Sequence, residues 1–529
     1  MKRLIRPLGL VLLIAGFIPA APGQKKEVEQ PKSGGILRVK AFAPQFNQNM
    51  DPVEPAHYFV LEQIYEGLVR FDHEMNVIPA LAEYWIVSDG GTKITFYLRR
   101  DVRFHHGAEF TSEDVRFSLE RLIRRASSDR THAYFLDKVE GAAEYYEGRA
   151  GRVTGFLTPD RHTFEIIWKR PYVSGLYLLA MYTCKILPRD LVLEQGRSFF
   201  QKPSGTGAFR FSHWMRSPRL DIVGVCLERN PDYHGKTPYL NELEYSPHFT
   251  LDQFESGDVH LTPLIHERLL RDRYAVLENV SVRSAFLGIS GDIPPMDDPR
   301  VRQALAVGLD KGGIAQAAYD TANVPQVAQG FLPPGLPGFF PLGDDPPPDL
   351  YKARALLRQA GIPSGPNPFK MAYGVVMPVT DFQIRIHREL RRQLAELGID
   401  LEMVSLKTAE DFRTLPVPFL SLVQWQMDIP DPEDLIAPLF QSRSEMNARH
   451  FRYANPRLDR LLELSEGETS WRQRTRIFRE MELLLLEEMP AVPLYTMKLR
   501  VALQPFVRGV RAPALGFYFM DLKNVWLDR

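Results

Sequence analysis

A tryptophan and a nearby aspartate are the residues of this sequence best suited to binding a charged ligand. Trp425 and Asp428 stand in the run QWQMD at 424–428, and a proline-rich turn follows. An ammonium group that leaves water needs a carboxylate partner, and an indole beside it can form an apolar wall. Aspartate is also common in turns, so residue type alone favours a loop-capping Asp428 and a core Trp425.

A second group of polar residues has metal-binding chemistry without a metal-binding spacing. His105, His106, Glu109 and Asp114 lie close together along the chain. The HExxH spacing that places two histidines on one helix face is absent from them. A strand, a turn and a capped helix are therefore favoured over a metal centre, and we expect neither a metal nor a cofactor.

The common motifs for catalysis and nucleotide binding are missing. The glycine-rich run GTGAF at 205–209 lacks the Gly-Lys-Ser/Thr ending of a phosphate-binding loop and does not match GxGxxG. GxSxG and the Ser-x-x-Lys set are absent as well. We expect no catalytic residues, with a secreted hydrolase built on a dispersed triad as a less favoured alternative.

The elements that must position these residues alternate between strands and helices. Apolar residues at every second position predict a strand over 94–98, and Thr111 with Asp114 predicts a capped helix start after a turn at Gly107. Later in the chain, a helical pattern over 390–397 is followed by a strand pattern over 399–403. This order favours an α/β fold with layered helices and sheets.

Composition sets the broad class of the protein. A chain of 529 residues is too long for one core, so two or more domains are expected. Lysine and arginine balance aspartate and glutamate at 65 each, which gives no charge pattern for binding nucleic acid. We therefore expect no nucleic-acid partner.

The N-terminus has the features of a secretory signal peptide over residues 1–23. A basic start precedes a short apolar run and small residues at a cleavage point, and an uncleaved anchor is the alternative. No cysteine follows the apolar run to carry a lipid anchor. We expect a periplasmic protein. In that compartment Cys184 and Cys226 could pair in a disulfide or remain two buried thiols, and their spacing does not decide between these states.

Several runs together resemble the extracytoplasmic solute-binding proteins of the peptide/nickel class (family 5), the capture subunits of ABC importers. The strongest is the segment 92–122, in which LRRDVRFHHG leads into TSEDV. Weaker matches are GGILRV at 34–39, GTGAF at 205–209, RNPDY at 229–233 and DPRVRQAL at 298–305. Ala208 stands where the family usually has proline.

The resemblance implies a two-lobed periplasmic binding protein (class II-like, cluster C) with an additional small domain on the first lobe. Lobe one would comprise residues 34–50, 185–285 and 495–529. The additional domain would comprise 51–184, and lobe two would comprise 286–494. Two chain crossings would form a hinge, and closure would bury a ligand between the lobes.

The resemblance also reverses the interpretation of the 424–428 run. Peptide-binding relatives use the aspartate of a Trp-x-x-Asp element to pair with the ligand's α-ammonium group, and Asp428 is the matching position. Trp425 would line the cleft, while Tyr495 at the return crossing could contact ligand or be packed structurally. Bulky Gln426 and Met427, together with Ile429, depart from the family and would alter the pocket.

The implied function is the capture of peptides for delivery to a membrane permease, by a monomer without catalytic activity. The alternative keeps the fold and changes the solute to a nickel chelate, a sugar, an opine or another small amine.

Overall fold

The computed structural model describes residues 30–41, 47–54, 57–125, 131–264, 266–319, 323–341, 347–363 and 369–529. The expected signal segment 1–23 lies outside these ranges. Within them, no helix combines the length and apolar character that crossing a membrane requires.

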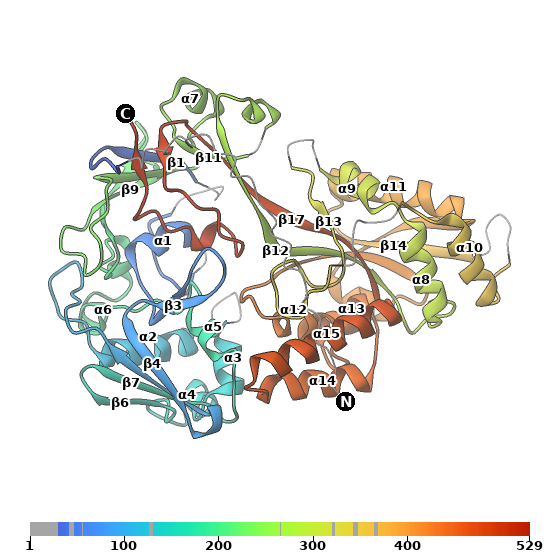
Figure 1. Ribbon diagram of the computed structural model, residues 1–529, viewed down its shortest axis with the longest axis horizontal. Coiled ribbons are helices and arrows are strands. Elements are labelled where there is room, and N and C mark those ends of the chain that lie inside the picture. Colours follow the sequence, from blue (N-terminus) through green and yellow to red (C-terminus); the bar gives the residue numbers. More distant parts are fainter. Residues whose placement is uncertain are drawn as a thin grey trace, which may run out of the picture.

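One mixed sheet of 11 strands extends through both halves of the molecule (Figure 1). Its order is β15 (Ile399–Leu406), β14 (Phe369–Val376), β16 (Phe419–Gln426), β12 (Ala275–Ile289), β17 (Ala491–Leu503), β11 (Leu261–Pro263), β1 (Ile36–Lys40), β10 (Glu242–Ser246), β9 (Ile222–Arg229) and β8 (Phe209–Arg216), with β13 (Gln326–Val327) paired to β17. The part around β1 and β8–β11 is lobe one, and the part around β14–β16 is lobe two.

Two long antiparallel strands, β12 and β17, connect the lobes. At one end β17 pairs with β11, and at the other end β12 pairs with β16. The ladder between β12 and β17 has a register shift between Val280 and Ser284 and another between Ala285 and Phe286. Figure 1 shows the two strands side by side between the halves, so the chain crosses between lobes there in both directions.

A separate four-stranded sheet carries the 92–122 segment. Its order is β4 (Ala82–Ser88), β5 (Lys93–Leu98), β7 (Thr163–Ile167) and β6 (Phe156–Asp160). Every second residue of β5 is buried, as the alternation predicted. Helix α2 (Ser112–Arg125) follows, and the Asp114 carboxylate accepts hydrogen bonds from the Thr111 amide and hydroxyl at 2.9 Å each, which confirms the predicted helix start.

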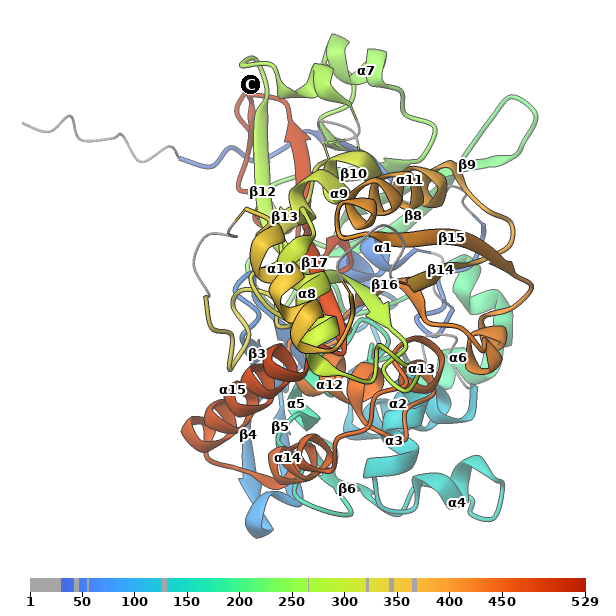
Figure 2. The same cartoon turned by 90° about the vertical axis from the view of Figure 1, so that its right-hand side faces the viewer.

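Helices cover lobe two in two groups. One group is α8 (Pro299–Gly308), α9 (Lys311–Ala318), α10 (Leu350–Gln359) and α11 (Asp381–Glu396), which Figure 2 shows around strands β14–β16. The other is α12 (Glu433–Phe440), α13 (Glu445–His450), α14 (Pro456–Gly467) and α15 (Trp471–Glu488). The predicted helix over 390–397 and strand over 399–403 correspond to α11 and β15.

The remaining elements are short. The helices are α1 (Tyr58–Ile64), α3 (Thr131–Lys138), α4 (Ala142–Tyr146), α5 (Gly175–Leu179), α6 (Arg189–Gln195) and α7 (Leu251–Ser256). Two small antiparallel pairs are β2 (Val69–Phe71) with β3 (Val77–Pro79), and β18 (Val507–Arg508) with β19 (Trp526–Leu527).

Three large hydrophobic cores stabilise these layers. One lies in lobe one and includes the residues of α1, so α1 packs with lobe one although it falls within the predicted additional domain 51–184. A second lies in lobe two beneath α8–α11. The third is shared by the additional domain and by the segment 423–489 of lobe two. The additional domain therefore packs against lobe two through a continuous apolar core.

Candidate binding site

Trp425 lies near the end of β16, and Asp428 lies in the loop that connects β16 to α12. Both side chains are partly buried. The Trp425 indole Nε1–H donates to the backbone carbonyl of Asp434 at 2.7 Å. The indole is thus held against the first turn of α12, with the Asp428 loop between them.

Asp434 fixes the backbone of this loop, although no motif in the sequence distinguishes it from the neighbouring acidic residues. Its side-chain Oδ2 accepts the amide N–H of Asp428 at 2.6 Å and that of Ile429 at 3.2 Å. Burial, together with the nearby charge of Asp428, raises the pKa of Asp434 well above its usual value, against the lowering effect of its hydrogen bonds. The folded protein therefore favours the protonated form of Asp434.

A tyrosine from a distant part of the chain completes the arrangement. The Tyr134 hydroxyl, on α3, donates to Asp434 Oδ1 at 2.7 Å. Burial raises the pKa of Tyr134, and the charges of Asp434 and Asp428 raise it further. Asp428 thus lies where the additional domain meets lobe two.

A buried ion pair joins the same two segments. The Arg474 guanidinium on α15 contacts both carboxylate oxygens of Asp431, and its Nη2 donates to the Ser174 hydroxyl at 3.0 Å. Ser174 Oγ in turn donates to Asp431 at 2.9 Å. All three residues are fully buried, so this contact fixes the 431–434 turn against the additional domain.

The turn is strongly acidic. Glu433 lies 3.5 Å from Arg474, and burial with the charge of Asp431 raises the pKa of Glu433 to about 7. Lys138 pairs with Glu466 at 3.1 Å. Burial lowers the pKa of Lys138, but the charges of Glu433 and Glu466 outweigh this effect and raise it. Four acidic residues fall within residues 428–434, and Arg474 pairs with one of them, Asp431.

Trp425 and Tyr495 lie on opposite faces of the large sheet. Trp425 pairs with Ser284, which pairs with Thr496, so these three residues share one face. Gln424 is in the next row with Ala285 and Tyr495 and points to the other face, where its Nε2–H donates to the Tyr319 hydroxyl at 2.9 Å.

Tyr495 is a packed residue of lobe two. It is fully buried, and its ring meets that of Tyr319 edge-on at 5.5 Å between centroids. The structure therefore brings Trp425 and Asp428 together and places Tyr495 apart from them.

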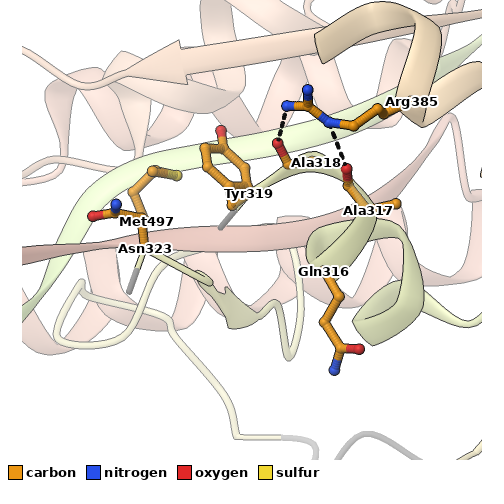
Figure 3. A pocket seen from close by; sticks show the side chains of 7 residues that line it. All are labelled: Gln316, Ala317, Ala318, Tyr319, Asn323, Arg385 and Met497. Atoms are coloured by element: carbon orange, nitrogen blue, oxygen red, sulfur yellow. Dashed lines mark hydrogen bonds between the residues drawn. The ribbon is translucent and has the colours of Figure 1, made fainter. Parts of the chain in front are cut away.

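A pocket of about 630 Å³ lies on the Tyr495 face. Figure 3 shows the residues that line it, namely Gln316, Ala317, Ala318, Tyr319, Asn323, Arg385 and Met497. Arg385 donates to the carbonyls of Ala317 and Ala318, both at 3.0 Å, and so caps the C-terminus of α9. This pocket is separate from the Asp428 loop.

The bulky residues beside Asp428 do not all line the site. Met427 and Ile429 are 1% and 3% exposed and belong to the core shared with the additional domain. Gln426 is partly buried and donates to the carbonyl of Met427 at 3.1 Å. Two of the three departures from the family pattern are thus core residues, which changes the expected effect on the pocket.

The two histidines of the second polar group form hydrogen bonds with the loop at 204–207. His105 Nε2 lies 3.0 Å from the Gly207 carbonyl, and His106 Nδ1 lies 2.7 Å from the Ser204 hydroxyl. Gly207 packs so closely on the end of α1 that a Cβ would lie 2.3 Å from the Gln63 carbonyl. Close backbone packing therefore accounts for the glycine. Within the described residues, no group of three or more His, Cys, Asp or Glu side chains is placed to hold a metal ion.

The two cysteines are buried thiols. Cys184 donates to the Leu178 carbonyl at 3.2 Å, and Cys226 lies on β9, so the described residues contain no disulfide between them.

The architecture defines a class: two α/β lobes joined by crossing strands, with an additional domain, as in extracytoplasmic solute-binding proteins. The model of the bacterial extracellular solute-binding proteins, family 5, matches residues 76–447. The chain therefore belongs to that family.

Individual relatives are similar over most of their length. Heme-binding protein A of Haemophilus influenzae is 25% identical over 483 residues, which is 86% of each chain. The dipeptide-binding protein of Escherichia coli is 25% identical over 491 residues, covering 87% of this chain and 88% of the relative. A periplasmic murein tripeptide binding protein in its unliganded open form shares the fold with a TM-score of 0.79, at 21% identity over 94% of this chain and 97% of the other.

Proposed function

We propose that this chain is the solute-capturing subunit of an ABC importer and that it binds short peptides with a free amino terminus between its lobes. The observation that carries the proposal is the placement of Asp428. Its loop is fixed by Asp434, flanked by Trp425 and surrounded by further carboxylates. Family membership and the dipeptide-binding relative support the same ligand class.

In this proposal Asp428 pairs with the ligand's α-ammonium group. The ammonium loses hydration as the lobes close, and a carboxylate compensates for that loss. Trp425 contributes an apolar surface beside the amine.

The protein acts without covalent chemistry and as a monomer. Relatives named as binding proteins support a role without catalysis, and the common catalytic motifs are missing from the sequence. Residues 1–23 are proposed to direct export to the periplasm, where the protein hands its ligand to a permease.

Native mass spectrometry of the protein purified from a periplasmic fraction tests the proposal. Released ligand is sequenced after denaturation, for the wild type and for Asp428→Asn. A mixture of short peptides in the wild type, lost in the variant, is the expected result. A single non-peptide solute would leave the family assignment unchanged but would show that the protein binds another class of ligand.

A further inference from the structure

One residue, Asp434, contacts three positions of the candidate site through its side chain and its backbone carbonyl. Asp434 is 3% exposed and lies in the first turn of α12. Its side chain accepts the amide N–H groups of Asp428 and Ile429, and its backbone carbonyl accepts the indole N–H of Trp425. The backbone that carries the Asp428 side chain is therefore fixed by Asp434.

The second side-chain oxygen of Asp434 contacts a distant segment of the chain. It accepts the Tyr134 hydroxyl of α3 at 2.7 Å across a sequence separation of 300 residues. The neighbouring Ser174–Asp431–Arg474 contact crosses between the same parts of the chain. Movement of α3 away from α12 would remove a donor from a buried carboxylate, which is costly unless the carboxylate reorients.

We propose that Asp434 is the positioning residue of the amine site and that its bond with Tyr134 couples the orientation of the Asp428 loop to the docking of α3. The inference rests on the proposed function, because it concerns the same carboxylate anchor. Affinity for an amine thus depends on a hydroxyl of the additional domain, through Asp434.

The mildest test replaces Tyr134 by phenylalanine, which removes the hydroxyl and keeps the ring. Asp434→Asn is the second variant, since it keeps the size of the side chain and replaces the carboxyl group by an amide. Tyr146→Phe is the matched control, because Tyr146 is 43% exposed in the same domain and its ring stacks on His132.

Calorimetry with trialanine and N-acetyl-trialanine measures the amine contribution in each protein. We expect Tyr134→Phe and Asp434→Asn to weaken trialanine binding about tenfold, the upper end of what one buried hydrogen bond contributes. Binding of the acetylated peptide should stay unchanged in all variants. Equal weakening of both peptides would mean a general structural role and would overturn the inference.

Amide hydrogen exchange gives a readout without ligand. The amides of Asp428 and Ile429 should exchange faster in Tyr134→Phe than in the wild type or in Tyr146→Phe. Unchanged exchange at both amides overturns the coupling. If the wild type does not distinguish trialanine from its acetylated form, the amine anchor fails, and this inference fails with it. Discrimination that survives intact in Tyr134→Phe overturns the inference alone.

Discussion

At the scale of single residues, Asp428 is the proposed partner of the ligand's amino group. Asp428→Asn keeps the shape of the side chain and removes its charge, so an ammonium ligand loses its partner. We expect a loss of about 1.5–3 kcal/mol, roughly tenfold to a hundredfold in affinity for a free-amine peptide. Titration calorimetry measures it. Asp137→Asn is the control. Asp137 is an exposed residue of α3, so its substitution removes one negative charge from the neighbouring surface and leaves the loop unchanged. Equal losses in both variants would indicate a diffuse field effect.

Glu482 gives a pH dependence that is independent of the ligand. It is fully buried on α15, and its carboxylate accepts the amides of Phe331 at 2.9 Å and Leu332 at 3.2 Å. Burial outweighs these bonds and raises its pKa from 4.5 to about 7. The folded state therefore holds this proton more tightly than the unfolded state does. Its contribution to stability is complete below about pH 4.5 and is lost as the pH rises towards 7.

The variant Glu482→Gln should remove that dependence. The wild type is expected to lose about 3 kcal/mol of unfolding free energy between these pH values through this group. Denaturant unfolding at several pH values should show a smaller fall for Glu482→Gln, whereas exposed Glu487→Gln should follow the wild type. A parallel pH profile for wild type and Glu482→Gln would show that Glu482 is ionised in the folded protein.

Residue types alone would have left Trp425 as a core residue and Asp428 as a loop cap. Trp425 and Asp428 could be singled out because they stand in a recognisable run. Asp434 could not, since it is one of several acids in a turn and its role depends on a hydroxyl 300 residues away. Tyr495 shows the converse difficulty. A conspicuous tyrosine was a candidate, but the side of the sheet that it faces is set by strand register.

At the scale of elements, local patterns were informative and long-range packing was not. The alternation in β5 and the capped start of α2 follow from residue order, and the structure confirms them. The shared core between the additional domain and segment 423–489 has no local signal. It forms because apolar surfaces far apart in sequence are complementary in shape.

The Ser174–Asp431–Arg474 contact should be essential to that packing. Arg474→Met leaves the Asp431 carboxylate buried without its cation, and breaking such a pair costs about 3–5 kcal/mol. We expect a markedly lower thermal midpoint by calorimetry. Arg472→Met, exposed two positions earlier on α15, is the control and should change little. The double variant Arg474→Met with Asp431→Asn should recover part of the loss. A wild-type midpoint in Arg474→Met would contradict a structural role for this contact.

At the scale of the whole molecule, two strands determine how the lobes can move. β12 and β17 are the long crossings, and their ladder is interrupted between Val280 and Ser284. An interrupted ladder bends more easily than a continuous one, so we infer that the hinge lies there. The core shared by the additional domain and lobe two makes separation of these two parts costly. Lobe closure around the hinge must therefore either retain this core contact throughout or form it again in the closed state.

Capture of a ligand by closure of the two lobes is the central claim, and small-angle X-ray scattering tests it most directly. The protein, freed of ligand by unfolding and refolding, is titrated with the peptides released from the native preparation. We expect a smaller radius of gyration and a shorter maximum dimension at saturation, and Asp428→Asn should need about tenfold to hundredfold more peptide to reach the same values. Identical scattering of the wild type with and without saturating peptide would contradict it.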